Sequence, residues 1–72
     1  MNIITKKTFY LNGEEYFSKD NLTLLDLLDY FDFNLSLSVL EYNNFICQKK
    51  HWNNISIRHN DKIEIITMVG GG

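Results

Sequence analysis

One stretch with helical spacing constrains the fold more than any other feature of this sequence. Within NLTLLDLLDYF (Asn21 to Phe31), apolar residues recur at the i, i+3, i+4 and i+7 positions of an amphipathic helix. Thr23, followed three residues later by Asp26, predicts a capping box at the start of this helix. Leu22 and Leu27 would form its hydrophobic staple. No other segment predicts a convincing helix, so the apolar side of this one must pack against β-structure.

Short β-type segments surround the helix. Before it, TFYLNGEEYF (residues 8–17) places Asn12-Gly13 between two β-rich runs, and this dipeptide supplies the positive φ angles of a type I′ hairpin turn. After it, the pattern predicts strands over residues 37–42, 45–48, 55–58 and 62–69, turns at 43–44 and 59–61, and a helical turn or a loop at 49–52. The expected fold is α+β, in the order β-β-α-β-β-β. One main helix would pack on one face of a mixed four- to five-stranded sheet.

Length, charge and cysteine usage limit the size and the partners of this fold. A chain of 72 residues with 44% hydrophobic residues predicts a single domain over residues 1–72 with one core. The net charge of −2, without a basic cluster, argues against nucleic acid or an anionic membrane as a partner. One cysteine, no signal peptide and no long apolar run predict a soluble protein of a reducing compartment. We expect the cytoplasm, or the plastid stroma if the abundant Asn, Ile and Lys reflect an AT-rich organelle genome.

No constellation of side chains predicts catalysis or metal binding. His51 and His59 lack the paired spacing of zinc ligands, and a single cysteine, Cys47, cannot hold an iron-sulfur cluster. A solvated helix face and a strand edge explain the neighbouring carboxylates, which are Asp26 with Asp29 and Glu14 with Glu15. The serines lack a G-x-S-x-G context, and no glycine loop precedes a helix. We therefore expect no catalytic residue, no metal and no cofactor bound by this chain.

Three of the four glycines occupy the last three positions, Gly70 to Gly72. Without Cβ atoms, this flexible C-terminal tail could thread a terminal carboxylate into a narrow site on another protein. The α-carboxyl of Gly72 would then be the reacting group. A free carboxylate is a poor electrophile, and the chain has no nucleotide-binding motif, so a partner enzyme must activate it, for instance as an acyl-adenylate. This predicts a carrier or a modifier rather than an enzyme.

Several motifs stand together at characteristic spacing in this chain. They are the Asn12-Gly13-Glu14 turn, LTLLDLL at 22–28, VLEYNNFI at 39–46, the tryptophan at 52, and NDKIEIITMVGGG at 60–72. This set resembles the ThiS family of sulfur carriers, within the wider ThiS/MoaD group. The resemblance implies a ubiquitin-like β-grasp fold and a role in building the thiazole moiety of thiamine. It also implies that Gly72 is the acceptor, with Gly70 and Gly71 in the functional tail.

The same resemblance implies a set of partners. An E1-like adenylyltransferase of the ThiF type would adenylate Gly72 with Mg-ATP, and a sulfur donor such as a cysteine desulfurase would convert the adenylate to a thiocarboxylate. A thiazole synthase of the ThiG type would then take the sulfur. Two other functions stay open, the small subunit of molybdopterin synthase and a ubiquitin-like protein modifier. We expect a monomer when the protein is free.

Strand alternation in the last predicted strand identifies a docking pair. If Ile63 and Ile65 face the helix, then Ile66 and Met68 point to the other side as an exposed apolar pair beside the tail. We expect this pair to dock both partner enzymes. The alternative is a bulge near Ile65 and Ile66 that would shift the pattern and place the pair in the core.

Overall fold

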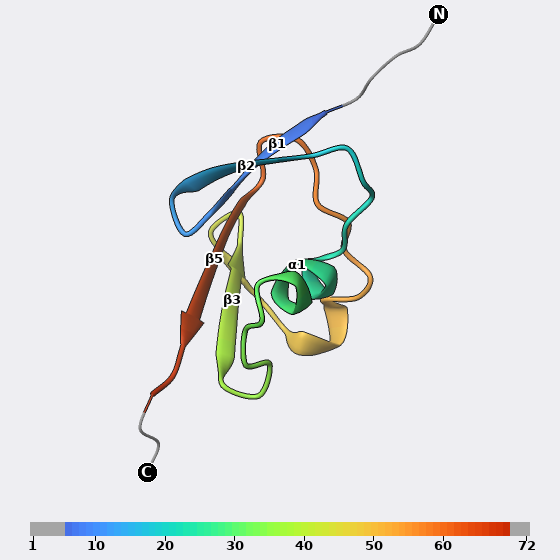
Figure 1. Ribbon diagram of the computed structural model, residues 1–72. Helices are drawn as coiled ribbons and strands as arrows, with labels where there is room; N and C mark the ends of the chain where they lie inside the picture. The colour runs from blue at the N-terminus through green and yellow to red at the C-terminus, as the bar shows by residue number, and fades with distance from the viewer. Residues whose placement is uncertain (1–5, 70–72) are drawn as a thin grey trace, which may run out of the picture.

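A five-stranded sheet with one helix on a single face forms the framework of the protein (Figure 1). The computed structural model describes residues 6–69. Its elements are β1 (Lys7–Leu11), β2 (Glu14–Ser18), α1 (Leu24–Tyr30), β3 (Ser38–Tyr42), β4 (Phe45–Cys47), the 3₁₀ helix η1 (Lys49–His51) and β5 (Lys62–Thr67). The expected α+β architecture, with one main helix on a mixed sheet, is confirmed.

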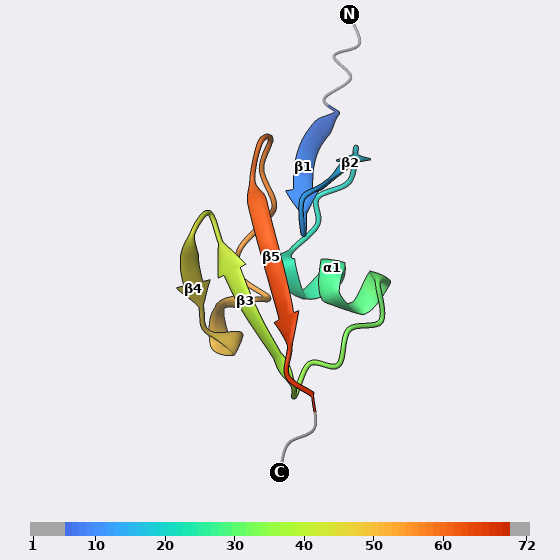
Figure 2. The same ribbon diagram turned by 90° about the vertical axis from the view of Figure 1, so that its left-hand side faces the viewer.

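The last strand, β5, lies in the centre of the sheet, whose order is β2-β1-β5-β3-β4. It runs parallel to β1 and antiparallel to β3, so each of the two hairpins pairs with it on one side (Figure 2). Because β1 and β5 run in the same direction, the start of β1 and the end of β5 lie at opposite ends of the sheet. The central position of β5 therefore decides where the C-terminal segment leaves the domain.

Both hairpins turn through two residues in the left-handed region. The first turn has φ angles of 50° at Asn12 and 82° at Gly13, and the second has 51° at Asn43 and 74° at Asn44. Positive φ at both central residues is typical of the type I′ turn, whose twist matches that of the flanking strands. Asparagine tolerates this region better than most residues because its short side chain can form local hydrogen bonds, so the second turn forms without glycine.

Helix α1 begins at Leu24, directly after its N-cap Thr23. The Thr23 side chain accepts a hydrogen bond of 3.1 Å from the backbone N–H of Asp26, and the Asp26 carboxylate accepts one of 2.9 Å from the backbone N–H of Thr23. The predicted capping box is therefore confirmed. The helix ends at Tyr30, with Phe31 as its C-cap.

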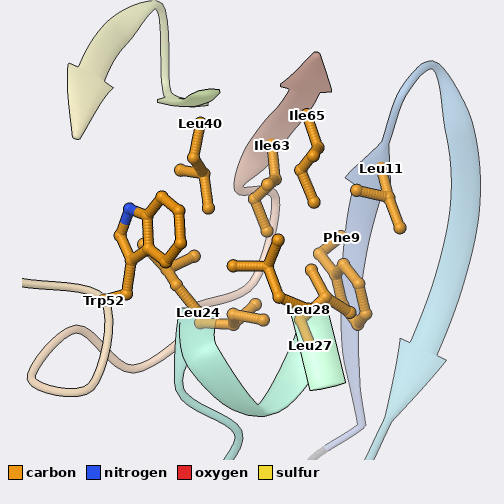
Figure 3. Close-up of a cluster of buried hydrophobic side chains, with 10 residues drawn as sticks. Phe9, Leu11, Leu24, Leu27, Leu28, Leu40, Trp52, Ile63 and Ile65 are labelled. Carbon is orange, nitrogen blue, oxygen red and sulfur yellow. The ribbon is translucent and has the colours of Figure 1, made fainter. Parts of the chain in front are cut away.

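The core fills the space between the sheet and α1 (Figure 3). Its buried members are Phe9, Leu11, Leu24, Leu27, Leu28, Leu40, Trp52, Ile57, Ile63 and Ile65. Trp52 lies at one side of this cluster, and its indole Nε1 donates a hydrogen bond of 2.9 Å to the carbonyl oxygen of Cys47. The tryptophan therefore closes the core and also ties the loop after η1 to strand β4.

The prediction of a strand over residues 55–58 is wrong. The segment forms only an isolated bridge between Thr23 and Ser56. The backbone N–H of Ile57 donates to the carbonyl of Leu22 at 2.7 Å, and that of Leu24 donates to the carbonyl of Ile55 at 3.0 Å. Because its hydrogen-bond partner is the entry to the helix rather than a strand, the alternating pattern here buries one side chain without joining the sheet.

The remaining boundaries differ by one or two residues. β5 ends at Thr67 rather than at Val69, although the backbone N–H of Met68 still donates to the carbonyl of Leu37 at 2.8 Å. Of the two alternatives for residues 49–52, the helical turn is present as η1. Strand β4 is correspondingly short, because η1 begins soon after Cys47.

Candidate functional site

Strand β5 fixes the chain that leads to the predicted tail. On one side, β3 pairs with it in a register that runs from Ile63 to Thr67. On the other side, β1 pairs with it at Lys62 and Ile63. Since both neighbours hold the strand by backbone hydrogen bonds, the chain leaves the sheet at one defined end, below the sheet in the view of Figure 2.

The side chains of β5 alternate between the core and solvent, as the sequence predicts. Ile63 and Ile65 are 1% and 6% exposed, whereas Ile66 and Met68 are 53% and 58% exposed. No bulge moves the latter pair into the core, because β3 and β5 stay in register through Ile66 and Thr67. The docking role of Ile66 and Met68 remains a prediction, but both side chains are accessible to a partner.

Further apolar side chains surround this pair. Val39 of β3 lies directly across from Ile66, and Leu37 accepts the last strand-like hydrogen bond from Met68. Leu37 is 43% exposed and Val69 is 91% exposed. We call these five residues, Leu37, Val39, Ile66, Met68 and Val69, the tail-base patch. Sequence reasoning missed Leu37 and Val39, and only the register between β3 and β5 could have identified them.

Carboxylates border the tail-base patch on the sheet face that α1 leaves open. Glu64 of β5 is exposed and lies directly across from Glu41 of β3. Two like charges in opposite positions of an antiparallel pair repel each other, so this cross-strand pair does not stabilise the sheet. The open face therefore combines an apolar area beside the chain end with an acidic row next to it.

The predicted acceptor and tail residues, Gly70, Gly71 and Gly72, lie outside the described residues. The described chain reaches Val69, whose side chain is the most exposed of its large apolar residues. Beyond Ile65, no side chain of the described β5 segment is buried. The chain that precedes the glycines thus contributes surface rather than core.

The other candidate groups are not brought together. Within residues 6–69, no three His, Cys, Asp or Glu side chains form a group that could hold a metal ion. His59 has a structural contact, because its Nδ1 accepts a 3.0 Å hydrogen bond from the backbone N–H of Thr8. Burial raises the pKa of the Cys47 thiol, which therefore keeps its proton more firmly than a free cysteine does. No helix of the described part is long and apolar enough to cross a membrane.

Several known proteins are similar to this chain. A protein of Trieres chinensis named Uncharacterized protein ycf40 is 64% identical over 70 residues, which are 97% of this chain and 96% of that protein. The Sulfur carrier protein ThiS of Bacillus subtilis is 33% identical over 63 residues, 86% of this chain and 96% of that protein. The crystal structure of a thiamine biosynthesis protein (ThiS) from Geobacter metallireducens matches with a TM-score of 0.76 at 18% identity, covering 90% of this chain and 99% of that one.

These comparisons settle the fold and the family. The structural match confirms the ubiquitin-like β-grasp fold. The ThiS family model matches residues 4–72, a range that starts before β1 and extends past Val69. With this match over nearly the whole chain, and with the Bacillus subtilis carrier as a relative, the chain belongs to the ThiS family of ubiquitin-like sulfur carriers.

Proposed function

We propose that this protein carries sulfur for the thiazole moiety of thiamine and that the α-carboxylate of Gly72 is the sulfur acceptor. The observation that carries this proposal is the exposure of Val69, 91%, two residues beyond the end of the central strand β5. Three glycines follow it in the sequence. Three extended residues span roughly 10 Å. The carboxylate can therefore enter an active site while the domain stays outside.

The proposed cycle begins with activation of the carboxylate. In an E1-like adenylyltransferase of the ThiF type, an oxygen of the Gly72 carboxylate attacks the α-phosphorus of Mg-ATP and displaces pyrophosphate. The outer sulfur of a persulfide, held by a donor such as a cysteine desulfurase, then displaces AMP and forms an acyl disulfide. A thiol reduces this disulfide, becomes disulfide-bonded to the donor cysteine, and releases the thiocarboxylate. A thiazole synthase of the ThiG type takes the sulfur, and an oxygen from its substrate or from water replaces it, which restores the carboxylate. ATP and Mg²⁺ bind to the partner enzyme, and this chain acts as its co-substrate.

The tail-base patch is the docking surface in this proposal. Ile66 and Met68 lie at its centre, and Val39 extends it across the sheet. Burial of apolar surface on docking favours association. Because the patch adjoins the start of the glycine tail, an enzyme that binds it also brings the tail to its active site. The same patch would serve both enzymes in turn.

The next part of the proposal concerns the oligomeric state of the protein, its compartment and the partners that its charge argues against. We propose that the free protein is a monomer and that it works in the plastid stroma if the chain is organelle-encoded, or otherwise in the cytoplasm. Its net charge of −2 supports neither nucleic acid nor an anionic membrane as a partner.

Intact-mass spectrometry tests the proposed cycle. The chain is incubated with ATP, Mg²⁺, a ThiF-type enzyme and a sulfur donor, and the expected product is heavier by the exchange of one oxygen for sulfur. A matched chain that ends at Gly71 should stay unmodified. Covalent addition to lysines of other proteins would instead identify a ubiquitin-like modifier. Stable copurification with a large molybdopterin synthase subunit would identify the second sulfur-carrier alternative.

A further inference from the structure

Strand β4 forms one outer edge of the sheet (Figure 2). It carries two exposed apolar side chains. Phe45 is 78% exposed and Ile46 is 72% exposed. They are consecutive, so they point to opposite faces of the sheet. No charged residue interrupts the strand, whose sequence is FIC. An exposed edge without a charged residue invites pairing with another chain, and proteins usually protect such edges.

The opposite edge strand, β2, is protected in the usual way. Its first two residues, Glu14 and Glu15, are charged and exposed. Its exposed aromatic residue, Phe17, lies under the ammonium group of Lys6, which is 4.4 Å from the ring centroid and adds a charge at this edge. The two edges therefore differ in charge, because β2 begins with two carboxylates whereas β4 carries no charged residue.

The hydrogen-bonding groups of β4 are available in one position. In the β3-β4 hairpin, Tyr42 pairs with Phe45 across a two-residue turn, and Ile46 pairs with Glu41. Hydrogen-bonded and non-hydrogen-bonded pairs alternate along an antiparallel ladder, and a two-residue turn is closed by a hydrogen-bonded pair. The backbone N–H and C=O of Ile46 therefore point away from the sheet, where an added strand could bond to both.

The surroundings of the edge specify what could bind there. A shallow hollow of about 410 Å³ lies beside β4, and its lining includes Phe45, Cys47 and Ile55. Directly after the strand, η1 consists of Lys49, Lys50 and His51, and it contains no acidic residue. An extended segment on this edge would meet apolar surface along β4 and positive charge at the end of the strand.

We propose that β4 and η1 form a docking edge for an extended segment of a partner protein, which adds a strand antiparallel to β4. Apolar side chains of that segment lie beside Phe45 and Ile46, and its carboxylates lie opposite Lys49 and near Lys50. Strand addition uses backbone hydrogen bonds for affinity and alternate side chains for specificity. This edge is separate from the tail-base patch, so it does not depend on the proposed sulfur chemistry.

A second copy of the chain fits this edge less well. If two β4 strands paired about Ile46, Phe45 of each copy would face Cys47 of the other, but Lys49 would face Asn43. No carboxylate would then compensate the lysines. The charge of η1 therefore favours an acidic partner segment.

Amide chemical shifts of the ¹⁵N-labelled full chain test the proposal with a defined probe, the peptide acetyl-Asp-Asp-Val-Ile-Val-amide. We expect its binding to shift the amides of residues 45–51 and to slow hydrogen exchange at Ile46.

A peptide with Lys-Lys in place of Asp-Asp should bind about fivefold more weakly, because each exposed ion pair contributes little. The Lys49→Glu/Lys50→Glu variant should reverse this preference. A peptide N-methylated at its isoleucine should lose most of its binding.

Matched variants distinguish binding at the β4 edge from non-specific binding of the peptide. Ile46→Lys should abolish the shifts, whereas Phe17→Lys, the same type of change on the opposite edge strand, should leave them in place. Equal binding of the acidic and basic peptides would overturn the proposal, as would shifts that map outside β4 and η1. Concentration-dependent shifts of the same amides without peptide would assign the edge to a second copy and refute the acidic occupant.

Discussion

Asn12 accepts a hydrogen bond of 2.8 Å from the backbone N–H of Ile65 through its side-chain oxygen. Its own backbone N–H donates to the carbonyl of Ile63 at 2.9 Å, so Asn12 continues the parallel ladder after β1 has ended. Asn43 acts in the same way on the other side of β5. Its N–H donates to the carbonyl of Lys62 at 2.8 Å, and its side-chain oxygen accepts from the Lys62 N–H at 2.8 Å. The two turn asparagines thus hold the central strand from both sides.

Asn12→Gly should lower the free energy of unfolding by about 1 to 2 kcal/mol, because the Ile65 N–H loses its acceptor while glycine still adopts the required φ angle. Asn12→Ala should cost about 1 kcal/mol more, since a Cβ-bearing residue without a local hydrogen bond is strained there. Urea unfolding followed by circular dichroism measures both variants. If the two proved as stable as the parent protein, the side-chain oxygen of Asn12 would have no role in holding β5.

A buried carboxylate, Asp61, joins the other end of β5 to the second hairpin turn. It is 7% exposed and accepts hydrogen bonds from the Tyr42 hydroxyl, the Asn43 side-chain amide and the Arg58 backbone N–H. Asp61→Asn replaces an acceptor oxygen with a donor group, and we expect it to reduce the free energy of unfolding by about 2 kcal/mol. Combined with Tyr42→Phe, it should cost less than the sum of the two single changes. Strict additivity in the double-mutant cycle would argue against a shared network.

The same contact predicts a loss of stability in alkali. Burial, and then the hydrogen bond and negative charge of Asp61, raise the pKa of Tyr42 from 10.0 to about 12. Because the folded pKa lies above the unfolded one, Tyr42 stabilises the fold fully below its unfolded pKa, and this contribution is lost as the pH rises toward the folded pKa. Urea unfolding between about pH 9 and pH 12 should show a steeper decline for the parent protein than for Tyr42→Phe. Parallel pH profiles would contradict the assignment.

How far the sequence predicts this structure depends on the range of each interaction. The Thr23 capping box and the Asn12-Gly13 turn depend on neighbouring residues, and both form as expected. Ile57 also belongs to an alternating pattern, but its backbone bonds to Leu22 rather than to a strand, which local periodicity cannot reveal. The carboxylate of Asp61 lies within a predicted turn, and its partner Tyr42 is 19 residues away, so sequence spacing gives no sign of the bond.

The candidate site also contains features that the local sequence pattern predicts and features that depend on which strands pair. The exposure of Ile66 and Met68 follows from alternation within one strand, so the sequence predicts it. Leu37 and Val39 join the tail-base patch only through the pairing of β3 with β5, and alternation within a single strand does not reveal which strands pair. The parallel pairing of β1 with β5 is equally non-local, although it is what places the chain end in the middle of the sheet.

Ile66→Asp combined with Met68→Asp should raise the KM for the chain in adenylation by a ThiF-type enzyme about tenfold or more, because a central apolar contact is replaced by charge. Both side chains are more than half exposed, so the circular dichroism spectrum should be unchanged. Tyr30→Asp, an exposed position on the helix, serves as the control and should leave KM as it is. An unaltered KM in the double variant would remove the tail-base patch from docking, and loss of the fold would show that the pair is structural.

Gly71→Val should abolish sulfur loading without unfolding the domain. A branched Cβ restricts φ and widens the chain, so the carboxylate of Gly72 could no longer enter a narrow active site. Stability should persist, because the buried side chains of β5 end at Ile65 and its last strand-like hydrogen bond is made by Met68. Intact-mass analysis after incubation with ATP, a ThiF-type enzyme and a sulfur donor measures loading, and thermal unfolding measures the fold. Normal thiocarboxylate formation in this variant would show that the tail needs no narrow passage, and the functional reason for three terminal glycines would be lost.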